Sequence, residues 1–183
     1  MTRALIGLAA VSVLAVAAHA EQQPPLRPTR DVDVTYRVGD DAHMQQRMRW
    51  MASRQIMRID PPTPGFHVII DYGAGRMSVV RDEERLVVDM KAPAGIAGGP
   101  PATPSYERRG DDTVAGVPCT DWRATNSEGA AALACITADG VLLRVRSGEH
   151  VLASAVSVNY APQDAATFAV PADYTHRTAG PAR

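Results

Sequence analysis

Residues 113–146 read TVAGVPCTDWRATNSEGAAALACITADGVLLRVR, and this stretch decides the fold. It holds both cysteines of the chain, Cys119 and Cys135, with the polar run TNSEG at 125–129 between them. The segments before and after that run are rich in apolar residues, and the run itself suits a turn. The stretch therefore predicts two adjacent antiparallel strands joined by a disulfide.

A redox-active cysteine pair is the alternative interpretation. Such pairs usually sit close together as C-x-x-C with a lowered thiol pKa, whereas Cys119 and Cys135 are sixteen positions apart. A structural disulfide also agrees with the export signal described below, because exported proteins meet an oxidising compartment.

Further along the same stretch, Asp139-Gly140 separates two apolar runs. An Asp-Gly pair in this position is a strong hairpin signal, because a type I′ turn needs positive φ at both central residues. We expect a type I′ hairpin here, with the following run at 141–146 as its second strand.

The N-terminus carries the features of a secretory signal. Residues 1–20 read MTRALIGLAAVSVLAVAAHA, with Arg3 before an apolar run and the small-x-small pattern Ala18-His19-Ala20 at the end. The run is too short for a stable membrane span, so we expect a Sec-type signal that is cleaved between Ala20 and Glu21. No later segment approaches 18 apolar residues, so no transmembrane segment is expected in the mature chain.

The charge balance of the mature chain limits its partners. Removing residues 1–20 takes Arg3 from the 19 basic residues and leaves 18 against 20 acidic ones. This balance argues against nucleic acid and anionic membrane surfaces as dominant partners.

Alternation with a period of two marks most of the remaining segments as strands. In 31–38 the residues Val32, Val34, Tyr36 and Val38 face one way and charged or polar residues the other, which is typical of a sheet with one dry face. The segment 44–51 alternates in the same way, although a helix is its rival interpretation. Further strands are expected at 54–60, 66–72, 76–81, 86–90 and 150–160.

About nine or ten short strands and no long helix predict an all-β protein with minor helical turns. We expect a single curved antiparallel sheet or half-barrel over 31–174, after an extended lead-in at 21–30 and before a disordered tail at 175–183. The Ala-, Gly- and Pro-rich stretch 92–104 is expected to be a linker, a lid or a crossing between sheet edges. One helical turn is expected at 162–168, with Phe168 pointing back to the core.

The sequence contains none of the standard catalytic or metal-binding motifs, such as G-x-S-x-G, H-E-x-x-H, a P-loop or an EF-hand loop. Its histidines are scattered. We therefore expect no catalytic residues, no metal site and no cofactor, and predict that the protein is not an enzyme.

Two motifs carry a resemblance to known proteins. The segment 110–144, read as G-x-x-T-V-A-G-V-P-C-T-D-W and then A-C-I-T-A-D-G-V-L-L-R, resembles an uncharacterised family of small exported proteins from Gram-negative bacteria. The ending F-A-V-P-A-D-Y at 168–174 looks like the closing F-x-x-P-x-x-Y of that family. More distantly, the strand order is similar to the superfamily of the lipoprotein carrier LolA and the sensor RseB, which are curved half-barrels holding apolar moieties on the concave side. The resemblance implies this fold and a periplasmic location, and it carries over no catalytic residue.

These observations lead to a hypothesis of function. If the sheet curls without closing, its inward side chains line a concave face that binds an apolar group: an acyl chain, a lipoprotein or a hydrophobic segment of an envelope protein. The 92–104 loop or the 162–168 turn would cover that face. The alternative is a structural or interaction domain of the cell envelope with a sealed core and no small-molecule ligand. The expected lining residues are Val34, Tyr36, Met48, Trp50, Val68, Ile70, Met77, Val79, Val88 and Met90.

Overall fold

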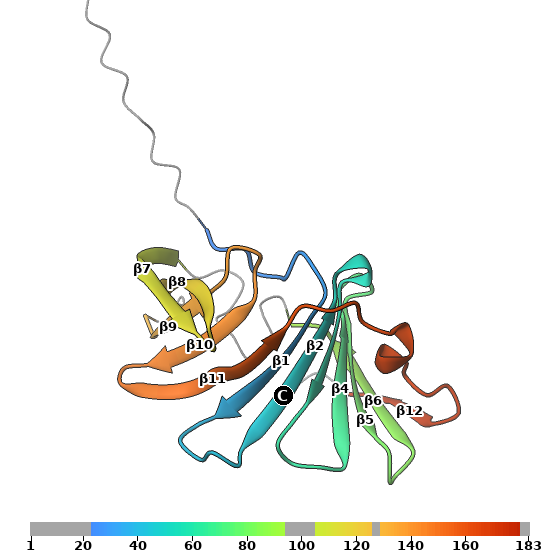
Figure 1. The fold of residues 1–183 in the computed structure, drawn as a ribbon. Helices are drawn as coiled ribbons and strands as arrows, with labels where there is room; N and C mark the ends of the chain where they lie inside the picture. Colours follow the sequence, from blue (N-terminus) through green and yellow to red (C-terminus); the bar gives the residue numbers. More distant parts are fainter. Residues whose placement is uncertain (1–22, 94–104, 126–128, 180–183) are drawn as a thin grey trace, which may run out of the picture.

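The computed structural model describes residues 23–93, 105–125 and 129–179, and in these residues twelve strands form one curved, open sheet (Figure 1). The all-β class and the curved antiparallel sheet expected from the sequence are thereby confirmed. The strands are β1 (Val32–Val38), β2 (Gln45–Met51), β3 (Ile56–Asp60), β4 (Phe66–Asp71), β5 (Arg76–Arg81), β6 (Leu86–Lys91), β7 (Ser105–Val114), β8 (Val117–Thr125), β9 (Ala131–Ile136), β10 (Leu142–Ser147), β11 (His150–Asn159) and β12 (Thr175–Thr178). Two 3₁₀ turns, η1 (Ala52–Arg54) and η2 (Ala165–Phe168), complete the described elements.

The sheet consists of two meanders joined side by side. Its strand order is β12-β6-β5-β4-β3-β2-β1-β11-β10-β9-β8-β7, and every described neighbour pair is antiparallel except β12 with β6. The first meander runs from β1 to β6 and the second from β7 to β11, whose last strand pairs with β1. The connection between β6 and β7 therefore has its two ends near opposite edges of the sheet. Most of that connection, residues 94–104, lies outside the described part, as do the signal segment and its Ala20–Glu21 cleavage site.

The stretch that decides the fold forms three strands and two hairpins, but its turns differ from the expectation. The β9–β10 hairpin is present, yet Gly140 alone has positive φ there, and its amide donates to the Thr137 carbonyl at 3.0 Å. This is a longer turn than the type I′ turn predicted for Asp139-Gly140. Positive φ at two consecutive residues occurs instead at Ala115 and Gly116, in the two-residue β7–β8 loop, as a type I′ turn requires.

Besides its positive φ, position 140 requires glycine because of a close contact. A Cβ built there would lie 2.2 Å from the Arg27 carbonyl oxygen. The segment before β1 therefore packs directly on this hairpin. Two further contacts hold it in place, because Thr29 donates its amide to the Asp139 carbonyl at 2.9 Å and Arg30 pairs with the Asp139 carboxylate at 2.6 Å.

The sheet curves so that one face meets itself. Met57 and Ile59 of β3 line the same pocket as Leu142 and Val145 of β10, although β2, β1 and β11 lie between these strands. In a flat sheet, four strand spacings of about 4.8 Å would keep them roughly 19 Å apart. This face is therefore concave.

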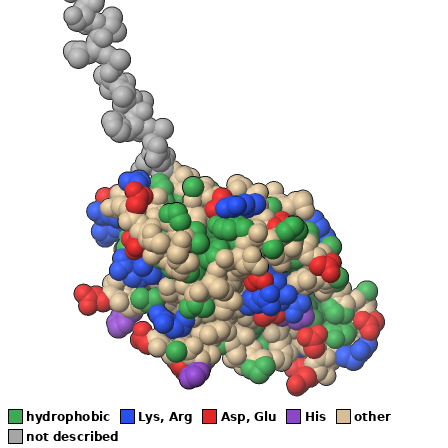
Figure 2. Space-filling model, viewed as in Figure 1, with side chains coloured by type: hydrophobic (Ala, Val, Ile, Leu, Met, Phe, Trp, Pro, Cys, Tyr) green, Lys and Arg blue, Asp and Glu red, His purple; other side chains and the backbone are tan. Residues whose placement is uncertain are grey.

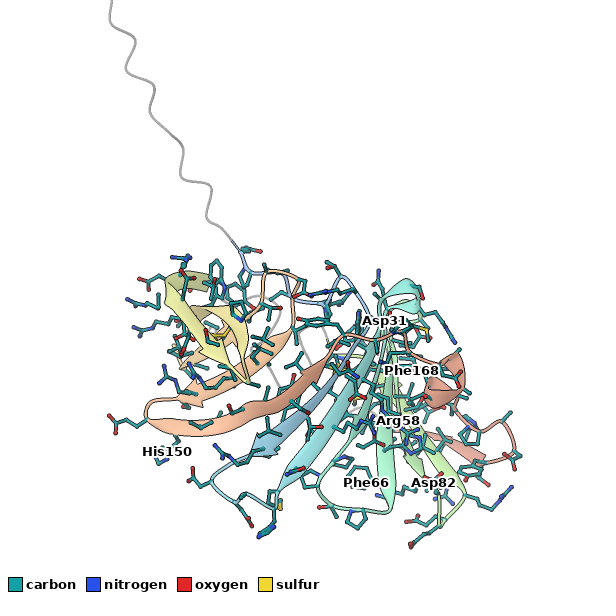
Figure 3. All side chains as sticks on the ribbon, viewed as in Figure 1. Asp31, Arg58, Phe66, Asp82, His150 and Phe168 are labelled. Atoms are coloured by element: carbon teal, nitrogen blue, oxygen red, sulfur yellow. A yellow bond between two sulfur atoms is a disulfide. The ribbon has the colours of Figure 1, made fainter. Side chains whose placement is uncertain are left out.

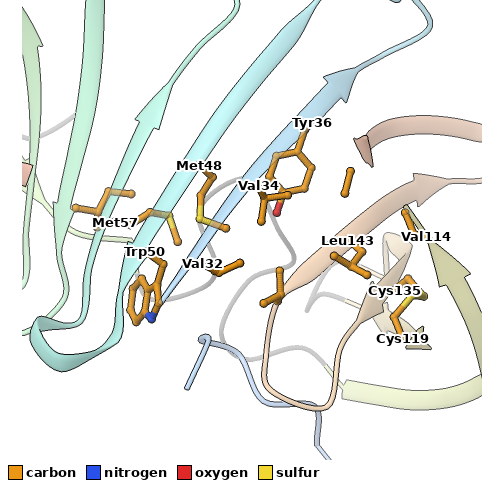
Figure 4. Close-up of a cluster of buried hydrophobic side chains, with 13 residues drawn as sticks. Val32, Val34, Tyr36, Met48, Trp50, Met57, Val114, Cys119, Cys135 and Leu143 are labelled. Carbon is orange, nitrogen blue, oxygen red and sulfur yellow. A yellow bond between two sulfur atoms is a disulfide. The ribbon is translucent and has the colours of Figure 1, made fainter. Parts of the chain in front are cut away.

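The main core lies between the two meanders (Figure 4). Side chains of β1, β2 and β3, among them Val32, Val34 and Trp50, belong to one buried cluster with Leu143 and the Cys119–Cys135 disulfide. The disulfide joins the neighbouring strands β8 and β9, as the sequence predicted.

The opposite, convex face has a core of its own over β2, β3 and β4. Phe168 of η2 packs there against Met51, Ile56 and Ile69, and all four residues are buried. The prediction that Phe168 points back to a core is correct, but the proposal that this turn covers the concave face is wrong. Two hydrogen bonds hold the η2 segment on the convex side. Arg58 donates to the Thr167 carbonyl at 3.0 Å, and Asp31 accepts from the Gln163 amide at 2.9 Å. Figure 3 shows Arg58 and Asp31 near Phe168.

Three strand assignments differ from the alternation pattern. Thr175–Thr178, assigned to a disordered tail, forms β12 on the edge of the sheet. In β11 a bulge opposite Thr35/Tyr36 reverses the faces, so that Leu152 and Val156 are exposed and Ala155 enters the core. The strand expected from residue 54 begins only at Ile56, after η1. At 44–51 the strand interpretation is confirmed against the helix, with Met44 left outside it and exposed.

In the described part of the chain, no helix has the length and apolar character needed to cross a membrane.

Candidate binding site on the concave face

Two rows of apolar side chains cross the first meander on the concave face. Directly opposed residues of neighbouring strands share a face, so the register defines each row. One row is Val34, Met48, Ile59, Val68, Val79 and Val88. The other is Val32, Trp50, Met57, Ile70, Met77 and Met90. Together with Tyr36, the rows place all ten residues of the expected lining on one face.

Burial divides the ten residues into two groups. Five are part of the core, with exposed fractions of 6% or less: Val34, Tyr36, Met48, Trp50 and Ile70. The other five, on β4, β5 and β6, are only partly buried: Val68, Met77, Val79, Val88 and Met90. The concave face is thus sealed at the junction of the meanders and open beyond it.

A narrow pocket marks the sealed end. Its apolar wall comes from Tyr36, Met48 and Ile59 on one side and from Leu142 and Val145 on the other. The cavity volume is about 50 Å³, well below the roughly 300–1,000 Å³ of small-molecule sites. In this state it accommodates one small apolar group and no long chain.

Polar groups frame that pocket. The Tyr36 hydroxyl donates to the Leu142 carbonyl at 2.6 Å, and burial raises the pKa of Tyr36, with a smaller contribution from Tyr160. Arg144 lies at the rim, where it is paired with Asp112 and faces Asp121 at 3.6 Å. Because acidic side chains already match its charge, Arg144 is not free to pair with an anionic ligand.

A wider hollow marks the open end of the same face. Phe66 and Val79 form its apolar part, and Arg81, Glu83 and Glu84 stand at its polar edge. Its cavity volume is about 300 Å³. Val68 lies between Ile59 of the narrow pocket and Val79 of the wider hollow, so one row of side chains connects the two.

Sequence reasoning missed several residues of this face. Ile59 and Phe66 belong to strands that were predicted, and their alternation with the expected lining residues was a usable signal. Leu142 and Val145 could not be found in this way, since they reach the pocket from the other meander through the curvature of the sheet.

Within the described residues, no group of three or more His, Cys, Asp or Glu side chains is placed to hold a metal ion. The buried histidine, His67, lies on the convex face, with its Nδ1 at 3.3 Å from an oxygen of Asp82. Burial lowers the pKa of His67, and the positive charge of Arg58 lowers it further, against the opposing effect of Asp82 and Asp60.

The depressed pKa of His67 predicts a pH dependence of stability. The unfolded chain, with a histidine pKa of about 6.5, takes up the proton before the folded protein does. The stabilising contribution is therefore complete above about pH 6.5 and is lost as the pH falls below that value. Urea unfolding of the wild type should show a falling midpoint between about pH 7 and pH 5.5, above the range where carboxylates titrate. In His67→Gln this fall should be smaller, and an equal fall in both proteins would contradict the assignment.

Comparison with known proteins supports the fold. By sequence, no protein-family model and no curated protein matches the chain. By structure, it is similar to an uncharacterized conserved protein from Thermus thermophilus, with a TM-score of 0.58 and 14% identity over 82% of this chain and 91% of that one. The chain also resembles MucB, with a TM-score of 0.45, 13% identity and coverage of 81% of this chain but only 60% of MucB. For MucB in complex with MucA(peri) the values are 0.42, 16%, 80% and 55%. At 14% identity, the likeness to the Thermus thermophilus protein shows the fold alone.

Proposed function

We propose that this protein is a non-catalytic binding module of the cell envelope, which receives an apolar protein segment on the concave face of its sheet. The observation that carries the proposal is the open half of the two apolar rows, where Val68, Met77, Val79, Val88 and Met90 stay partly exposed. Contiguous apolar surface of this kind marks interaction sites in soluble proteins.

The two hollows favour a protein segment over an enclosed acyl chain. The narrow pocket, about 50 Å³, is too small for a long chain, and the 300 Å³ hollow is shallow and edged by charged residues. An extended segment could place one apolar side chain in each hollow, with the row through Val68 between them. The periplasmic location belongs to this proposal and rests on residues 1–20, which lie outside the described part.

A sealed structural domain remains the second candidate, and a specific observation favours it. Half of the expected lining is ordinary core: Val34, Trp50 and Ile70 are each 1% exposed or less, and Tyr36 and Met48 are 6% exposed. Substituting such residues would unfold the protein and could not test binding. The open residues must carry the test.

Val79→Arg is the variant that tests the proposal, because it places a charge in the open hollow without removing a core side chain. The probes are a fluorescein-labelled peptide of alternating leucine and threonine, and a fluorescent fatty-acid analogue. The peptide should bind, and Val79→Arg should weaken it by about tenfold or more, the cost of losing a buried apolar contact and desolvating a charge. Val156→Arg makes the same substitution on β11, at a residue that is 47% exposed and lines neither hollow, and should leave binding unchanged.

The remaining outcomes are also decisive. Uptake of the fatty-acid analogue in preference to the peptide would replace the proposal with an acyl carrier. Failure of both probes, with both variants folded by circular dichroism, would leave the sealed structural domain.

A further inference from the structure

The convex face carries a hollow that plays no part in the proposed function. It lies between strands β3 to β5 and the η2 segment, and its cavity volume is about 300 Å³, at the lower bound of small-molecule sites. Its lining includes Arg54, Ile56, Ile69, Asp71, Arg76 and Phe168. Two segments that lie about a hundred positions apart therefore build one site.

The floor of this hollow is made of packed apolar side chains. Ile56, Ile69 and Phe168 are each 3% exposed or less and form one packed cluster, with Val170 beside it. Asp164 caps η2 by accepting a hydrogen bond from the Ala166 amide at 3.0 Å. An apolar group that enters the hollow meets a surface that is already formed.

The rim is positively charged. Arg54 and Arg76 line it, and Lys91 lies directly opposite Arg76 in the next strand. In the described part of the chain none of these three side chains has an ion pair or a hydrogen bond, whereas ten other arginines are ion-paired. Figure 2 illustrates the paired arginines: on the side of the molecule that it displays, basic and acidic side chains are interspersed.

The nearby carboxylates compensate only part of this charge. Asp71 lies directly opposite Arg76 in the neighbouring strand, and it accepts a hydrogen bond from the Ala74 amide of its own turn at 2.8 Å. Asp89 accepts from the Ser78 hydroxyl at 2.5 Å and contacts His176 Nδ1 at 2.9 Å. Burial acts to raise the pKa of Asp89, but the hydrogen bonds with Ser78 and His176 outweigh it and lower the pKa. The positive charge of Arg76 adds a smaller lowering effect. Three cations thus face two carboxylates, and the rim keeps an excess of positive charge.

We propose that this hollow binds a small amphiphilic anion, a single carboxylate on a short apolar body. The guanidinium groups of Arg54 and Arg76 supply paired donors that match a carboxylate. The apolar body lies on Ile56, Ile69 and Phe168. Neither element alone would select such a ligand, because a neutral apolar molecule leaves the cations unused and a small polar anion leaves the floor uncovered.

Sodium octanoate is the probe, added to the ¹⁵N-labelled full chain during amide NMR titration. We expect shifts in β3, β4, β5 and η2, and weaker binding at high salt, because exposed charges are screened. Octan-1-ol, with the same tail and no charge, should bind more weakly. Arg76→Gln should raise the Kd for octanoate by about tenfold, as expected for the loss of a charged hydrogen bond.

Arg123→Gln is the matched control, since Arg123 is exposed on β8 and also lacks an ion pair or side-chain hydrogen bond within the described residues. It should leave octanoate binding unchanged. The proposal is overturned if octanoate causes no shifts, if octanol binds equally well, if both glutamine variants lose the same affinity, or if the shifts fall on the concave residues around Val79. Binding at this site does not depend on the concave face, so Val79→Arg should not affect it, and the two proposals can fail separately.

Discussion

Cys119→Ser is expected to lower the free energy of unfolding by about 2–5 kcal/mol, the usual cost of removing a native disulfide from a small secreted domain. The bond joins β8 and β9 across a sequence separation of 16, for which the restriction of the unfolded chain alone contributes about 3 kcal/mol. Cys119 and Cys135 are 5% and 1% exposed, so the variant also leaves a hydroxyl in the core. Urea unfolding at equal pH measures the total.

Two controls separate the parts of that loss. Ala134→Ser puts a hydroxyl at a fully buried position of the same strand pair, and its cost can be subtracted. The double variant Cys119→Ala/Cys135→Ala removes the bond without the hydroxyl and should still lose most of the stability. Alkylation of the unreduced wild type should label neither cysteine. Two reactive thiols in the wild type, or a loss of less than about 1 kcal/mol of unfolding free energy in the double variant, would show that the disulfide does not stabilise the fold.

Alternation predicted strands well where one face is buried and the other is wet. In β1 the buried residues Val32, Val34 and Tyr36 are the ones that the pattern selects. In β4 the pattern is ambiguous, because Ile69 and Ile70 are consecutive and both buried, one under η2 and one on the concave face. A strand that is covered on both sides has no wet face to mark its orientation.

Other features depend on the backbone and leave little trace in composition. The β11 bulge shifts the pattern by one residue, so Val156 is exposed although its neighbours in the alternation are not. β12 pairs through its backbone and all four of its residues are exposed, so its sequence shows no alternation of apolar and polar residues that would predict a strand. The type I′ turn lies at Ala115-Gly116 because Val114 and Val117 are the last paired residues of β7 and β8, which leaves a two-residue loop between them.

For the candidate site, the sequence predicted which face each side chain occupies but not whether that side chain is buried. Local alternation places side chains on a face, and it did so for all ten lining residues. Whether a residue on that face is core or open surface depends on which strands fold over it. Met48 is buried because β10 curls against it, whereas Val79 is partly open two strands beyond β3. That distinction lies in the curvature of the sheet and in long-range contacts.

Phe168→Ala is expected to lower the free energy of unfolding by about 3–5 kcal/mol, the range for truncation of a buried phenylalanine. The ring is 2% exposed and packs on Met51, Ile56 and Ile69 across the convex face. It also anchors the C-terminal segment, which otherwise depends on hydrogen bonds such as that from Arg58 to the Thr167 carbonyl. Removal of the ring therefore leaves a cavity and weakens the attachment of η2.

The other phenylalanine of the chain is the matched control. Phe66 is only partly buried at the open end of the concave face, so Phe66→Ala should cost about 1–2 kcal/mol, because less apolar area leaves water. Phe168→Leu should recover much of the loss, since it refills most of the volume. The urea midpoint should move with little change in slope if the native state stays compact. Equal losses for the two alanine variants would mean that η2 only rests on the sheet, and the convex hollow would then lack the fixed wall that its ligand requires.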